Sequence, residues 1–88
     1  MRLPIIRKMT EYIENPENET KLVHTIEVLE NVSQARGLKD EELGAIGELV
    51  SNFCGSLEVK KMMQDGAPKT QALNDFMARV MGSIDKPN

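Results

Sequence analysis

One stretch of the chain, Asp40 to Gln64, constrains the fold more than any other. Three acidic residues open it and two lysines stand near its end. Charges of these signs stabilise the two ends of a helix dipole. Apolar residues recur through the stretch at helical spacing, and Asp65-Gly66 follows as a stop. The pattern therefore predicts one long helix, capped at Lys39 or Asp40.

Three further segments carry apolar residues at helical spacing. They are bounded by Asn15-Pro16, Gly37 and Gly82, which stop helices, and we place them at Pro4–Glu14, Asn18–Arg36 and Pro68–Met81. No stretch alternates apolar and polar residues with the period of a strand. We predict an all-α fold: a small bundle of about four helices with short connections around one long central helix. Residues 1–88 form a single domain, with a frayed tail over 85–88.

The size and charge of the chain limit its partners. At 88 residues, the surface that folding can bury leaves a thin margin of stability, so we expect self-association, most simply as a dimer. Eleven basic residues against 14 acidic ones give a net charge of −3, without the basic patch that nucleic acid requires. No apolar run is long enough for a membrane span or a signal peptide, which favours a cytoplasmic location.

Small residues form a stripe along the long helix. At about 100° per residue, four of them share one arc beside the apolar arc: Gly44, Gly47, Ser51 and Gly55. Because glycine destabilises a helix interior, the stripe predicts close packing against another helix, from this chain or from a second copy. A groove for a ligand or a partner is the alternative, and a helix broken at Gly55 is another. Met77 and Met81, one turn apart, are candidates for the same packing or partner surface.

Residues able to do chemistry are few. Cys54 is the only cysteine, and it falls on the apolar arc with Val50, Phe53 and Leu57, so we predict a buried, inert thiol. His24, the only histidine, lies opposite the apolar face of its helix and is expected in solvent. One thiol and one imidazole exclude a cysteine-cluster metal site and any site that needs two histidines. We therefore expect no catalytic residue, no metal and no cofactor, and a protein that is not an enzyme.

Several segments resemble a family of small uncharacterised bacterial proteins, a domain of unknown function. They are Leu3–Ile6, Leu38–Leu43, Ile46–Asn52, Ala72–Met77 and Gly82–Asp85, so that the resemblance covers nearly the whole chain. The resemblance implies no activity, cofactor or catalytic residue. It does imply a redox context, because genes of this family can lie near those of thioredoxin-like and thiol-peroxidase proteins.

Three functions are compatible with these features. The first is a non-catalytic interaction or assembly module that self-associates through apolar helix surface. The second is an accessory protein in a thiol-redox context that uses Cys54. The third is a helical binder of small ligands in a groove beside Gly47 and Ser51. Accessibility of the thiol discriminates between the first two.

Overall fold

The computed structural model describes the backbone of residues 2–85 and the side chains of residues 2–80. It contains four helices, with bounds α1 Leu3–Tyr12, α2 Pro16–Val32, α3 Asp40–Gln64 and α4 Lys69–Asp85. Residues 2–85 contain no strand. The predicted all-α fold is therefore confirmed.

The long helix begins and ends as the sequence predicts. The Lys39 backbone N–H donates to Oε1 of Glu42 at 2.9 Å, which resolves the ambiguous cap in favour of Lys39. α3 runs without interruption through Gly55, so the predicted long helix is confirmed and the alternative of a break at Gly55 is wrong. One glycine lowers helix stability by only about 0.5–1 kcal/mol, and packing in the second half of α3 offsets that loss.

The ends of α2 and α4 differ from the predicted ones. α2 begins at Pro16, because Oδ1 of Asn15 accepts the Glu17 N–H at 3.0 Å and proline fits the first helical position. It ends at Val32, ahead of a loop in which Gly37 has a φ of 83°. α4 continues through Gly82 to Asp85, so the predicted stop is wrong. The rest of the predicted tail, 86–88, lies outside the described residues.

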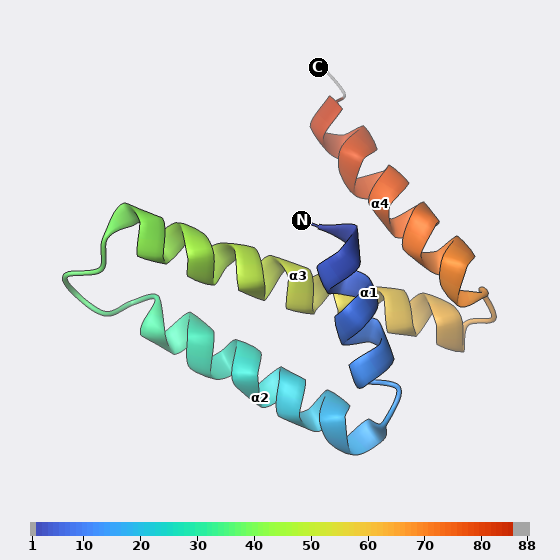
Figure 1. Cartoon of the computed structure of the whole chain (residues 1–88), viewed down its shortest axis with the longest axis horizontal. Coiled ribbons are helices and arrows are strands. Elements are labelled where there is room, and N and C mark those ends of the chain that lie inside the picture. Colours follow the sequence, from blue (N-terminus) through green and yellow to red (C-terminus); the bar gives the residue numbers. More distant parts are fainter. Residues whose placement is uncertain (1, 86–88) are drawn as a thin grey trace.

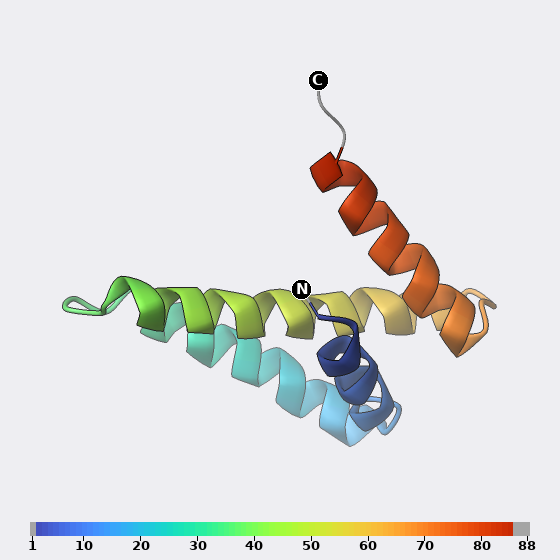
Figure 2. The ribbon, with the colours of Figure 1, turned by 45° about the horizontal axis from the view of Figure 1, so that its top comes forward.

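α3 is the central element, and each of the other helices packs against it. Figure 1 shows α2 running antiparallel beside α3, α1 crossing α3, and α4 departing from the far end of α3. The turned view in Figure 2 shows the end of α4 standing away from the other helices. The arrangement is thin, with principal extents of 43 × 40 × 19 Å.

Two apolar clusters form the core, and α1 contributes to both. The first contains Ile6, Val59, Ala72, Leu73 and Phe76, and joins α1, α3 and α4. The second contains Ile13, Leu22 and Ile26, with Met9, Val50, Phe53 and Leu57 packed against it, and joins α1, α2 and α3. Both clusters draw on α3 only from Val50 onward.

Polar contacts from α3 hold the two ends of α1. Oδ1 of the fully buried Asn52 accepts the Arg2 backbone N–H at 2.8 Å, just before α1 begins. At the other end, Nζ of Lys60 donates to the Ile13 carbonyl at 2.8 Å and pairs with the Glu19 carboxylate. A cation at the C-terminus of a helix also favours its dipole. α1 is therefore fixed to α3 by hydrogen bonds as well as by apolar contacts.

Residues 27–49 form a two-helix arm beyond both clusters. This hairpin arm consists of the second half of α2, the loop 33–39 and α3 up to Leu49. It carries four of the six large apolar side chains that are exposed among the described residues: Val28, Val32, Leu43 and Leu49. The accessible surface of the chain is 6127 Å², against about 5,200 Å² for a compact monomer of this mass. The chain thus leaves about 900 Å² more surface in solvent than its size requires.

Leucine substitutions at two glycines of the stripe should have opposite effects. A Cβ at Gly47 would meet nothing within 4 Å, whereas one at Gly55 would lie 3.1 Å from the Phe76 ring and 3.4 Å from Ile6 Cδ1. Gly47→Leu should raise the free energy of unfolding by about 0.5–1 kcal/mol through helix propensity. Gly55→Leu should lower it by about 1–3 kcal/mol through overpacking. Urea denaturation measures both, and a destabilised Gly47→Leu would contradict the open placement of this face.

Candidate functional site

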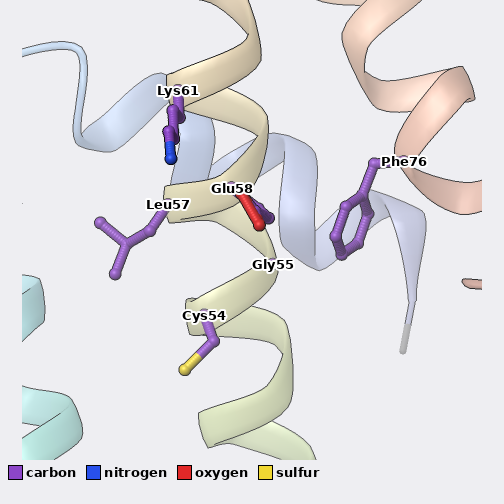
Figure 3. Close-up of a pocket in the computed structure, with 6 residues that line it drawn as sticks. All are labelled: Cys54, Gly55, Leu57, Glu58, Lys61 and Phe76. Atoms are coloured by element: carbon purple, nitrogen blue, oxygen red, sulfur yellow. The ribbon is translucent and has the colours of Figure 1, made fainter.

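The candidate site is a shallow depression on α3, with a volume of about 390 Å³. Its lining residues are Cys54, Gly55, Leu57, Glu58, Lys61 and Phe76. Figure 3 shows that α3 supplies all of them except Phe76, whose ring stands on α4 to one side. Ligand pockets usually enclose most of their ligand between several elements. The depression, formed by one helix and one ring, lacks such enclosure.

Cys54 is exposed, so the predicted burial of this thiol is wrong. The apolar arc of α3 is wider than the surface that other helices cover. α2 covers Val50, Phe53 and Leu57, whereas Cys54 lies about 60° beyond Leu57 around the helix. The sequence correctly placed Cys54 beside apolar residues, but it could not indicate where the cover of α2 ends.

The surroundings of Cys54 disfavour its thiolate. Partial desolvation raises the pKa of the Cys54 thiol, and the nearby Glu30 carboxylate on α2 raises this pKa further. Activated cysteines need the opposite, a cation or a helix N-terminus that lowers the pKa. His24 lies in solvent on α2, as predicted. The site therefore presents an accessible thiol that is mostly protonated at neutral pH.

The small-residue stripe divides into a covered part and an open part. Gly55 is buried against Phe76 and Ile6, which is the close packing that the sequence predicts. Gly44 and Gly47 have nothing within 4 Å of an added Cβ, and Ser51 is exposed. No other helix of the described chain covers this open part, and the depression begins beyond it.

Of the two candidate methionines, the structure describes the side chain of Met77 only. Met77 is half-buried and packs against the first cluster, beside Leu73 and Phe76. The side chain of Met81 lies outside the described ones. Met77 therefore fills core space on the inner side of α4.

Buried polar residues are what sequence reasoning missed. Asn52, Ser56 and Thr10 have no exposed surface, and Lys60 is nearly covered. Thr10 and Ser56 donate to backbone carbonyls of their own helices, at 2.7 Å each. The only available signal was their spacing, because Asn52, Ser56 and Val59 repeat at four and three residues along one face of α3. These groups serve packing, and among the side chains of residues 2–80 no group of three or more His, Cys, Asp or Glu could hold a metal ion.

The model of a family of unknown function, DUF6952, matches residues 1–85 of this chain. The chain belongs to DUF6952. The predicted resemblance to an uncharacterised helical family is thereby confirmed, and DUF6952 membership brings no activity with it. No curated protein matches this DUF6952 chain, and no solved structure matches it either. None of its described helices is both long enough and apolar enough to cross a membrane.

Thiol labelling tests the placement of Cys54. The exposed thiol should react with a maleimide in the native protein, but more slowly than in the unfolded chain, because the raised pKa leaves less thiolate. Raising the pH should narrow the gap as the native thiol ionises. Glu30→Gln should speed native labelling by removing a negative charge, and Glu27→Gln, farther around the same helix, is the control. A thiol that reacts only after unfolding would contradict the exposed placement.

Proposed function

We propose that this DUF6952 chain is a non-catalytic helical assembly module of the cytoplasm that self-associates as a dimer. The function of the fold is to assemble, and the resulting dimer binds a protein partner through its surface. Neither nucleic acid nor a membrane is a partner, in keeping with the net charge of −3 and the predicted absence of a membrane span.

The observation that carries this proposal is the surface that the single chain leaves uncovered. A stable protein–protein interface takes about 800 Å² from each partner. The surplus of about 900 Å² over a compact monomer is of that size. It accompanies an arm whose exposed valines and leucines lie outside both core clusters. Association with a second copy would cover apolar surface that the chain cannot cover itself.

The chemistry of the described residues supports a non-catalytic role. Catalytic groups usually have strongly shifted pKa values and lie in a cleft with a partner that activates them. The Cys54 thiol has a raised pKa, and His24 lies on another helix in solvent. This arrangement favours binding through surface over catalysis.

An accessory role in thiol redox is the second candidate, and the exposure of Cys54 favours it. A disulfide of a thioredoxin-like partner could be attacked by the Cys54 thiolate, which would form a mixed disulfide and release one partner thiol. The raised pKa makes this attack slow unless the partner supplies a cation near the sulfur. This candidate therefore ranks below assembly. Binding of a small ligand beside Gly47 and Ser51 ranks lower still, because the depression lies farther along α3.

Sedimentation velocity over a wide range of concentration tests the proposed function. The weight-average mass should rise from the monomer mass of 9.9 kDa toward twice that value. The transition should persist in reducing buffer and in Cys54→Ser, because the association is non-covalent. A mass that stays at the monomer value throughout would contradict assembly as the function. Loss of the dimer in Cys54→Ser alone would favour the thiol candidate.

A further inference from the structure

Exposed apolar side chains from both helices of the hairpin arm lie on one side of it. On α3, the residues that α1 covers repeat as Asn52, Ser56 and Val59, at four and three residues. The same spacing continues backward to Leu49 and Ala45, which are both exposed. α1 has only 10 residues, begins at Asn52 and runs toward Lys60, so it does not cover this part of α3. The same face of α3 is therefore covered by α1 in the second half of the helix and exposed to solvent in the first half.

The adjoining surface of α2 is apolar on the same side. Val28 and Val32, one turn apart, are 60 % and 40 % exposed. Glu30 lies on the opposite flank of α2, toward Cys54, as its effect on that thiol requires. Since Cys54 and the α1-covered residues are on opposite sides of α3, Val28 and Val32 belong to the side of α1 and Leu49. We call Val28, Val32, Ala45 and Leu49 the arm face.

We propose that the arm face is the interface by which two copies of this chain associate, with the two arms packed face to face as a four-helix unit. This inference rests on the proposed function and names the surface that performs it. Because the arm face contains apolar residues from both helices of the hairpin, a two-fold axis can pair it with itself. Its four residues carry no charge, as is typical of the centre of an interface.

Area favours a second copy as the occupant. The surplus of about 900 Å² belongs to the whole chain, and the arm contributes to it with four of the six exposed large apolar side chains among residues 2–80. A standard interface takes roughly 800 Å² from each partner. A two-helix hairpin buries little apolar surface by itself, whereas two hairpins packed together form a core between four helices. α1 covers this face over the second half of α3. The partner's arm would cover the same face over the first half.

Charge substitutions on the arm face, compared with one elsewhere on α2, test this interface. Val28→Glu and Leu49→Glu should each weaken dimerisation at least about tenfold in sedimentation velocity, because each buries an unpaired carboxylate at the contact. Val23→Glu is the matched control: Val23 is 45 % exposed, on the opposite flank of α2, and should leave the dissociation constant unchanged. Far-UV circular dichroism and the melting temperature of the diluted monomer should be the same for all three variants, since these side chains lie outside the core clusters.

Disulfide cross-linking tests the same interface if a glutamate variant fails to fold. In a Cys54→Ser background, Leu49→Cys should oxidise to a disulfide-linked dimer, and Val23→Cys should remain monomeric under the same conditions. Dissociation by Val23→Glu but not by Val28→Glu or Leu49→Glu would overturn the arm-face interface while leaving self-association intact. A wild-type chain that is monomeric at every concentration would overturn both.

Discussion

α3 packs against every other helix, and its second half supplies the contacts on which the fold depends. Val59 is a fully buried member of one cluster, while Val50, Phe53 and Leu57 pack against the other. The same segment carries Asn52 and Lys60, which bind the backbone at the two ends of α1. Removing either side chain would leave a carbonyl or N–H of α1 without its partner, a loss of about 1–3 kcal/mol when such a group is buried. The second half of α3 therefore combines apolar and polar anchoring within about four turns.

The concentration of contacts in one half of α3 explains the open shape of the molecule. α1 is short, and the end of α4 stands away from the other helices (Figures 1 and 2). Neither covers the arm, so α2 and α3 continue beyond the core as a pair with exposed valines and leucines. Burying such surface is the main favourable contribution to protein association. Because α1 is short, the arm stays uncovered, and this exposed apolar surface is what the proposed assembly would bury.

The sequence could predict what depends on neighbouring residues and could not predict what depends on docking. The bounds of α3 followed from charges and a capping glutamate that act within one turn, and the structure agrees with them. Cys54 was wrongly placed in the core because the same apolar arc can be covered at its centre or at either edge, and only α2 decides which. Lys60 and Asn52 were overlooked because a polar side chain is buried only where a distant backbone group receives it. The stripe of small residues was correctly interpreted at Gly55, where Phe76 packs, and remains uncovered at Gly44 and Gly47.

Hydrogen exchange at two protein concentrations tests the central claim most directly, because it measures both halves of α3 in one experiment. The amides of residues 52–60 should be protected equally at high and low concentration, since α1 and α4 of the same chain cover them. Those of residues 28–32 and 43–49 should exchange rapidly in dilute protein and become protected as concentration rises. Equal and strong protection of the arm at high dilution would contradict the account, because it would mean that the single chain stabilises its arm without a second copy.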